Sequence, residues 1–330
     1  MLYLAASYGW RGGDTMVQAA KVLRLSKQVK AKPLSEWGSV AVEMLGTQTR
    51  IVRGKQYFHR VIECGDKGEP LILIHGIGGH AETYARNLWN LANNGFHVYA
   101  IDALYHGFSS KGPRDDENRT ERQAEALADL IQALGYSWAH VEGESMGGEI
   151  VFAFGLNFPQ MAGKLIMNTG GAYDVDLKRK DFKPNPGGGN TLAELSRASI
   201  LTPTFQTVRA RMEWLVAEPS RMTDEMVNIR LRLYSFPEVY ESIKWVYRVG
   251  QGGTWAQKMK YTEDDVKRFK PESLVFWTDK NPGDGPDYGK YFASLLPSAK
   301  FYNMLDAAHW PQWEKPEEHD QVLIDFIKGK

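Results

Sequence analysis

A serine flanked by two glycines stands directly after a short apolar run. Residues 143–147 read Gly-Glu-Ser-Met-Gly, residues 138–141 before them read Trp-Ala-His-Val, and residues 149–156 behind them have a helical pattern. A strand that turns sharply into a helix with a serine at its apex is a nucleophile elbow. The turn exposes the hydroxyl of Ser145 and directs the N–H of Met146 toward a developing oxyanion. The pattern predicts that Ser145 is a catalytic nucleophile.

A glycine-rich turn follows another apolar run far upstream. Residues 75–79 read His-Gly-Ile-Gly-Gly directly after the apolar residues 71–74. Such a turn can direct the N–H of Ile77 toward the same oxyanion as Met146, and Gly78 beside it is a candidate substrate contact. An ordinary glycine turn is the alternative. In combination with an elbow, we expect this turn to complete an oxyanion hole.

The best-placed base is His309, one of eight histidines in the chain. It follows the strand-like run at residues 300–304. A histidine after the final strand, in the chain order serine, acid, histidine, is the arrangement of α/β-hydrolases. We therefore expect His309 to take the proton of Ser145. His75 and His106 are expected to support the loops in which they lie.

The acid that should orient this histidine is where the pattern breaks. Hydrolases of this kind commonly carry Trp-Gly-x-x-Asp after the preceding strand, and here the residue in register with that Asp, counted from Trp277, is Asn281. Asparagine can accept a hydrogen bond but cannot stabilise an imidazolium by charge, and the analogous change in a serine protease lowers turnover by about 10⁴-fold. We predict that the acid has moved to Asp279. Asp284, the more distant Asp174, and a site without an acid are the alternatives.

The elements that must position these residues are apolar runs alternating with helical patterns. Alternation of this kind predicts a mostly parallel sheet covered by helices on both faces. Strand-like runs lie at residues 71–74, 98–102, 138–141, 164–168, 273–278 and 300–304, and helical patterns at 81–94, 120–134 and 322–327. The predicted fold class is α/β, specifically the α/β-hydrolase fold, with a mostly parallel twisted sheet and an inserted helical cap.

The strand rhythm disappears over residues 173–270, which open with a proline- and glycine-rich stretch and then carry helical segments rich in Trp, Tyr, Met and Arg. This segment is predicted to be the helical cap over the carboxyl ends of the strands. Residues 46–172 and 271–330 then form the α/β-hydrolase core. Residues 1–45 precede the first strands and are predicted to be an N-terminal helical extension.

Composition narrows the class of protein. The 330 residues hold 40 Lys+Arg and 40 Asp+Glu, a balance that argues against electrostatic binding of nucleic acid. The single cysteine, Cys64, cannot form an internal disulfide and fits a reducing, cytoplasmic compartment. No apolar stretch approaches the roughly 18 residues of a membrane span, and the N-terminus lacks the pattern of a secretion signal. We expect a cytoplasmic protein that acts on a small molecule without a membrane, metal or cofactor.

With these residues in view, the chain over residues 65–330 resembles the meta-cleavage product hydrolases, serine enzymes of aromatic catabolism that break C–C bonds. The likeness is strongest at residues 309–314, His-Trp-Pro-Gln-Trp-Glu, and extends to residues 163–171 and the lid-like residues 217–230. Ala308 stands where the family has Gly. Glu144 stands where the family often has Asn.

The resemblance implies a substrate of the 2-hydroxy-6-oxo-hexa-2,4-dienoate type, produced by aromatic ring fission. It implies that Arg230 holds the dienoate carboxylate and that Trp310 packs against the substrate, with a solvated lid residue and an aromatic packed beneath the cap as the alternatives. It further implies that Ser145 attacks the C6 carbonyl after the dienol becomes its keto tautomer, leaving an acyl-enzyme for water. Dimers are common in the family, so a homodimer is expected.

Two other functions remain open on the sequence. A carboxylesterase or lactonase would use the same Ser145 and His309 but would not need a carboxylate-binding Arg230. A ligand-binding hydrolase-fold protein with low turnover would be compatible with Asn281 at the position of the acid.

Overall fold

The computed structural model describes residues 38–171, 175–176, 182, 184–188, 190–248 and 260–330. Its centre is a sheet in which all strands run parallel except β2, which is antiparallel to both of its neighbours. In the described chain the order across this sheet is β1 (Gln48–Arg53), β2 (Phe58–Cys64), β4 (Phe96–Ile101), β3 (Glu69–Ile74), β5 (Ala139–Glu144), β6 (Ala162–Asn168), β9 (Ser273–Thr278) and β10 (Ala299–Met304). The mostly parallel α/β sheet expected from the alternating pattern is confirmed.

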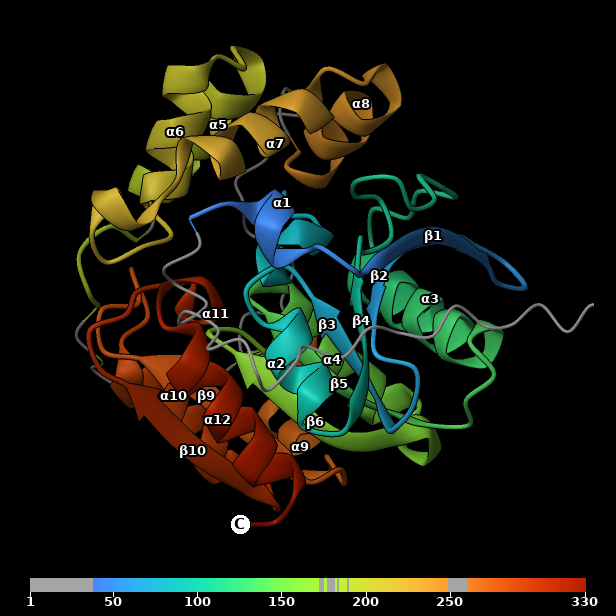
Figure 1. Cartoon of the computed structure of the whole chain (residues 1–330). Helices are drawn as coiled ribbons and strands as arrows, with labels where there is room; N and C mark the ends of the chain where they lie inside the picture. Colours follow the sequence, from blue (N-terminus) through green and yellow to red (C-terminus); the bar gives the residue numbers. More distant parts are fainter. Residues whose placement is uncertain (1–37, 172–174, 177–181, 183, 189, 249–259) are drawn as a thin grey trace, which may run out of the picture.

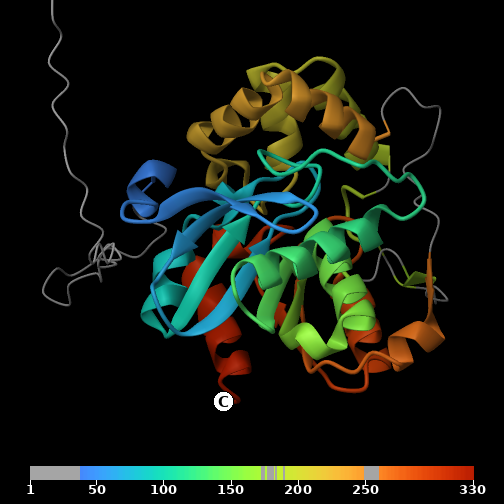
Figure 2. The same cartoon turned by 90° about the vertical axis from the view of Figure 1, so that its right-hand side faces the viewer.

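Helices cover both faces of the sheet (Figures 1 and 2). On one face the core includes Leu127, Ile150 and Phe292, which come from α3 (Arg119–Ala133), α4 (Met146–Asn157) and α10 (Pro286–Leu295). The other face buries Leu88 and Leu323, from α2 (Leu88–Asn93) and α12 (Pro316–Ile327). Strands covered on both faces are buried throughout, which is why β3, β5 and β9 read as continuous apolar or buried runs. Short helical turns join these elements: η2 (Ala81–Tyr84), η3 (Pro159–Met161), α9 (Glu263–Lys267) and α11 (Pro311–Glu314).

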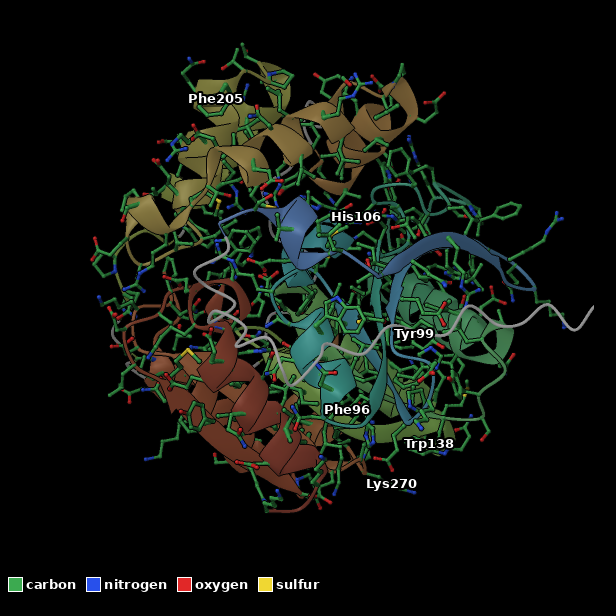
Figure 3. The ribbon with its side chains drawn as sticks, in the orientation of Figure 1. Phe96, Tyr99, His106, Trp138, Phe205 and Lys270 are labelled. Atoms are coloured by element: carbon green, nitrogen blue, oxygen red, sulfur yellow. The ribbon has the colours of Figure 1, made fainter. Side chains whose placement is uncertain are left out.

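A layer of helices lies above the sheet (Figures 1 and 2). It contains α5 (Asn190–Leu201), α6 (Phe205–Glu213), η4 (Pro219–Arg221), α7 (Asp224–Tyr234) and α8 (Pro237–Val246), and its side chains form a hydrophobic cluster of their own that reaches Trp310 and Trp313. Figure 3 shows which strand ends face it: Phe96, which begins β4, is far from this layer, whereas His106, beyond the end of β4, lies close beneath it. The carboxyl ends of the strands therefore face this layer of helices, which is called the cap below.

The two ends of the inserted segment come together in a second, two-stranded sheet of β7 (Val175–Asp176) and β8 (Tyr261–Thr262). Beyond β8, Val266 and Phe269 pack into the core against α4, where Phe269 stacks on Phe152 at 5.2 Å between ring centroids. The division of core and cap at residues 173 and 270 stays a prediction.

The first described element, α1 (Val40–Glu43), is held by the cap. Glu225 on α7 accepts a hydrogen bond from the N–H of Val40 at 2.7 Å and from the hydroxyl of Ser39 at 3.3 Å. Residues 1–37, most of the predicted helical extension, lie outside the described residues. Within the described parts of the chain, no helix is long and apolar enough to cross a membrane.

Candidate active site

Ser145 stands between β5 and α4 in a strained backbone conformation, with φ 55° and ψ −116°. A non-glycine residue adopts such angles only where its surroundings impose them. Two glycines allow the tight turn: a Cβ on Gly143 would lie 2.0 Å from the carbonyl oxygen of Gly147, and a Cβ on Gly147 would lie 2.4 Å from that of Ile74. The strand, serine and helix of the predicted elbow are thus present, and Ser145 lines a pocket beneath the cap.

His309 lies in the loop after β10, is buried, and lines the same pocket. Its Nδ1 is 2.6 Å from Oδ1 of Asn281. The amide group of Asn281 donates from Nδ2 to the carbonyl of Asp284 at 2.7 Å, so its oxygen faces the ring. The ring therefore donates its Nδ1 proton to Asn281, which leaves the lone pair of Nε2 available to a proton donor. Burial, with Arg211 adding to it, lowers the pKa of His309 to about 3.

The prediction of Asp279 as the acid is wrong in this structure. The carboxylate of Asp279 accepts a hydrogen bond from the N–H of Ala307 at 3.4 Å, and no contact joins it to His309. The backbone carbonyl of Asp284 accepts hydrogen bonds from Nδ2 of Asn281 and Nε1 of Trp277. The loop after β9 places residue 281, and not residue 279, opposite Nδ1 of His309. Asp174 lies outside the described residues.

A carboxyl group that sequence reasoning noted only as a departure lies on the other side of the ring. Oε1 of Glu144 is 3.3 Å from Nε2 of His309, and Oε2 accepts a hydrogen bond from the N–H of Gly76 at 2.6 Å. Burial raises the pKa of Glu144 to about 8, against the opposing effects of the Gly76 N–H, Arg230 and Arg211. The available signal was an acidic residue as the last residue of a buried strand, directly before the nucleophile.

Two buried guanidinium groups face the pocket from the cap. Arg230 on α7 is 2% exposed, and Arg211 on α6 is 3% exposed. Arg211 donates from Nε to Ser196 at 2.9 Å, while its Nη1 and Nε of Arg230 have no hydrogen-bond partner in the described chain. A buried cation with an unsatisfied hydrogen-bond donor is costly, so the pair favours an anionic ligand. The resemblance pointed to Arg230; Arg211 was missed because nothing in the sequence distinguishes it from the other arginines of the cap.

The pocket is small, and its roughly 210 Å³ of empty space includes a part that is open to solvent. Its walls come from three loops of the core and from the cap, and the lining residues are Gly76, Ile77, Gly79, Glu144, Ser145, Arg211, Leu215, Arg230, His309 and Trp310. Trp310 is thus both buried and part of the lining, with the guanidinium of Arg230 5.5 Å from its ring centroid. The backbone N–H groups of Ile77 and Met146 remain the predicted oxyanion donors.

The predicted substrate contact of Gly78 is not seen. Gly78 does not line the pocket, and a Cβ at this position would lie 2.5 Å from Oη of Tyr247 at the end of α8. The Tyr247 hydroxyl donates to the carbonyl of Ile77 at 3.0 Å. Gly78 has φ +69°, so its role is to turn the chain and to make room for the cap.

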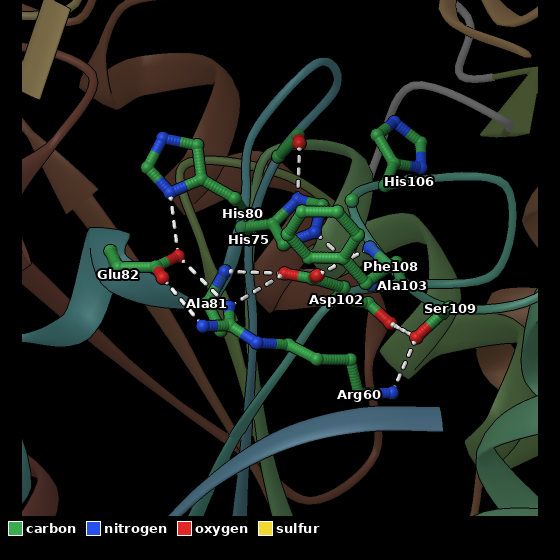
Figure 4. Close-up of polar contacts among 12 residues, drawn as sticks. Arg60, His75, His80, Ala81, Glu82, Asp102, Ala103, His106, Phe108 and Ser109 are labelled. Atoms are coloured by element: carbon green, nitrogen blue, oxygen red, sulfur yellow. Dashed lines mark hydrogen bonds and ion pairs between the residues drawn. The ribbon is translucent and has the colours of Figure 1, made fainter. Parts of the chain in front are cut away.

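Buried polar groups hold the loop that carries Ile77 (Figure 4). Nε2 of His75 accepts the N–H of Ala103 at 3.1 Å, so its Nδ1 carries the proton and donates to the carbonyl of Gly76 at 2.7 Å. Burial lowers the pKa of His75 to about 4, which keeps the ring neutral. Asp102 accepts the N–H groups of Ala81 and Phe108. His75 supports the loop, as the sequence predicted.

A family model described as alpha/beta hydrolase fold matches residues 69–197. The chain has the α/β-hydrolase fold. Among solved structures, 2-hydroxy-6-oxo-6-phenylhexa-2,4-dienoate hydrolase from Rhodococcus sp. strain RHA1 matches this chain with a TM-score of 0.72 and 18% identity, covering 86% of this chain and 99% of the other. A carboxylesterase from Bacillus subtilis matches with a TM-score of 0.67 and 17% identity, covering 90% and 96%. Structural likeness at this level shows the fold and does not select the reaction.

Similarity in sequence is more selective. A 2-hydroxy-6-oxononadienedioate/2-hydroxy-6-oxononatrienedioate hydrolase from Paraburkholderia phymatum is 29% identical over 276 residues, which is 80% of this chain and 89% of the relative. Another hydrolase with the same substrates in its name, from Pseudomonas putida, is 27% identical over 278 residues, 80% and 90% of the two chains. The chain therefore resembles the meta-cleavage product hydrolases.

Proposed function

We propose that this α/β-hydrolase breaks a C–C bond in a 2-hydroxy-6-oxo-hexa-2,4-dienoate-type ring-fission product, through an acyl-enzyme on Ser145. The observation that carries the proposal is the pair of buried guanidinium groups, Arg211 and Arg230, beside Ser145 and His309 in one pocket. An ordinary ester needs no such pair of cations. The carboxylate of a dienoate fits one of them, because a planar guanidinium binds a planar carboxylate through two hydrogen bonds, and the other guanidinium is left for a second anionic group.

His309 first assists conversion of the dienol to its keto tautomer. Nε2 then takes the proton of the Ser145 hydroxyl while Oγ attacks the C6 carbonyl, and the N–H groups of Ile77 and Met146 stabilise the oxyanion. Collapse breaks the C5–C6 bond, and its electron pair is delocalised into the keto acid fragment, which is protonated and leaves as hydroxypentadienoate. Water, deprotonated by His309, hydrolyses the remaining acyl-enzyme. Tautomerisation allows C5 to leave as a carbanion that is stabilised by conjugation with the C2 carbonyl, which is why a serine site can break this bond.

Arg230 is proposed to hold the C1 carboxylate, as the resemblance implied. Arg211 provides a second cation on a different cap helix, and it fits a second carboxylate on the substrate. The names of the relatives refer to dienedioates, which carry two carboxylates. We therefore propose a dicarboxylate as the preferred substrate.

A stopped-flow assay with purified protein tests the proposal. The yellow dienolate of 2-hydroxy-6-oxonona-2,4-dienedioate absorbs visible light, so its decay reports cleavage directly, and the 6-phenyl analogue and p-nitrophenyl butyrate serve as comparisons. Fast bleaching with release of succinate supports the proposal. Ester turnover with an untouched dienoate would assign an esterase instead, and silence with both classes of substrate would leave a ligand-binding protein.

A cytoplasmic homodimer is also part of the proposal. The single, buried Cys64 suits a reducing compartment, and dimers are common in the family that the chain resembles. Light scattering of the purified protein after gel filtration tests the oligomeric state: a mass twice that of the 37.3 kDa chain is expected.

A further inference from the structure

The two ring nitrogens of His309 face groups of different charge. Nδ1 faces the neutral amide of Asn281 at 2.6 Å, and Nε2 faces the carboxyl group of Glu144 at 3.3 Å. Over the described residues, no carboxylate is paired with Nδ1. A triad of serine, histidine and acid has its carboxylate at the other ring nitrogen. There the carboxylate faces Nδ1, and only the nucleophile faces Nε2.

A buried imidazole that takes the serine proton becomes a cation and needs a compensating charge. His309 is only 4% exposed, so solvent does not stabilise the positive charge of the imidazolium. Asn281 fixes the orientation and the tautomer of the ring but carries no charge. The nearby guanidinium of Arg211 adds to the cost of a second cation in this pocket.

We propose that Glu144 supplies the negative charge that the triad acid supplies in related sites, so that Asn281 orients His309 and Glu144 neutralises it. The proposal rests on the serine-hydrolase part of the proposed function and not on C–C cleavage.

The surroundings of Glu144 hold its carboxyl group in place for this role. The N–H of Gly76, from the loop after β3, binds Oε2 and leaves Oε1 toward the ring, where it has no hydrogen-bond partner in the described chain. Arg211 and Arg230 face Glu144 from the cap, and Glu142 lies on the same strand. The two cations favour the carboxylate, whereas burial and Glu142 favour the acid.

The proton then moves as follows. At rest, Glu144 and His309 share one proton, which lies on Glu144 because burial raises the pKa of the carboxyl and lowers that of the imidazole. Loss of this proton to solvent produces the active form, with an ionised Glu144 and a neutral ring. Nε2 next accepts the proton of Ser145, and the imidazolium forms beside the carboxylate. The proton taken from Ser145 is then delivered from Nε2 to the leaving group.

A double-mutant cycle of Glu144→Gln and Asn281→Asp tests the proposal. The rate at which a fluorophosphonate labels Ser145 is measured from pH 5 to pH 10, beside dienoate turnover. Labelling reports on Ser145 and His309 whatever the natural substrate is, so it still tests Glu144 if the dienoate proves untouched. Asp279→Asn is the matched control, since it makes the same chemical change in a carboxylate that does not touch His309.

In the wild type, labelling is expected to rise with an apparent pKa near 8, the value of the shared proton. Glu144→Gln keeps the acceptor for the Gly76 N–H but removes the charge, so labelling should fall by about 10²- to 10⁴-fold, as for loss of a triad acid. The apparent pKa with which labelling of Glu144→Gln rises should also fall below 6. Asn281→Asp should accelerate labelling at least tenfold in the Glu144→Gln background and by a clearly smaller factor in the wild type, where Glu144 already supplies the charge.

Two results would overturn the proposal. The first is a Glu144→Gln variant with labelling within threefold of the wild type and an unchanged pH limb. The second is an Asn281→Asp substitution that accelerates the wild type as much as it accelerates Glu144→Gln, because the two carboxylates would then not substitute for one another. If Glu144→Gln fails to fold, Asn281→Asp alone still decides: acceleration of wild-type labelling by tenfold or more would overturn the proposal.

Discussion

Ser145 lines the pocket and has a backbone conformation that only its two flanking glycines allow. We predict that Ser145→Ala lowers kcat by at least about 10⁴-fold, because the acyl-enzyme cannot form. The change removes one oxygen atom and leaves the turn intact, so the melting temperature should stay within a few degrees of the wild type. Stopped-flow turnover and calorimetry of the same preparation check both parts. Residual turnover above one per cent would contradict nucleophilic catalysis by Ser145.

Arg211 and Arg230 allow a second test with single residues. Arg230→Ala should lower kcat/KM about 10²-fold for the dienedioate and for the 6-phenyl analogue, because a charged bidentate contact to the shared carboxylate is lost. Arg211→Ala should have an effect of this size only on the dienedioate, which alone carries a distal carboxylate. Arg232→Ala is the control, since Arg232 is exposed on the same helix as Arg230. Equal losses for both substrates in Arg211→Ala would remove the second carboxylate site.

Among the elements, α8 of the cap is connected directly to the loop expected to form the oxyanion hole. The hydroxyl of Tyr247 donates to the carbonyl of Ile77 at 3.0 Å, and Gly78 has no side chain because this ring occupies the space. We predict that Tyr247→Phe lowers kcat by about three- to tenfold, the value of one hydrogen bond of about 0.5–1.5 kcal/mol. KM should change less, since the bond positions a loop of the core. Steady-state kinetics decide, and a change confined to KM would contradict this role.

Gly78→Ala probes the same contact from the other side. The added Cβ would meet Tyr247 at 2.5 Å and would stand on a residue with φ +69°, so strain is expected in both the cap and the loop. We expect lower kcat and a lower melting temperature together. Combining the two substitutions should cost less than their sum, because the phenylalanine ring removes the nearest atom of the clash.

For the molecule as a whole, a buried charged group links the core to its last helix. His319 on α12 lies 2.8 Å from Glu142 on β5 and 3.1 Å from Asp320, and these carboxylates outweigh burial and raise the pKa of His319 to about 9. The folded pKa thus exceeds the unfolded value of about 6.5. The stabilisation is therefore fully present below about pH 6.5 and is lost as pH rises toward 9.

We predict that the free energy of unfolding decreases between pH 6.5 and pH 9 by an amount on the order of 1–3 kcal/mol that is absent in His319→Gln. Denaturant titrations of both proteins at several pH values measure it. Parallel pH dependence of the two proteins would show that the pair is not charged. His319 does not line the catalytic pocket, so the measurement of stability is separate from the test of Ser145.

Sequence alone determined the features set by near neighbours in the chain. The turn at Ser145 depends on residues within two positions of it, and the alternation of apolar and helical runs depends on periods of a few residues, so the elbow, the α/β class and the loop positions of Ile77 and His309 could all be predicted.

Tertiary structure decided what meets His309 and what faces the substrate. Asn281 lies 28 positions before His309 and Glu144 far earlier, and only the packing of separate strands brings their side chains to the two edges of one ring. Loop conformation also turned Asp279 away, although its residue type suited the task better. Arg211 became a candidate only when α6 was seen above the pocket, because the direction of a side chain on a helix follows from what the helix packs against, and no local pattern records that.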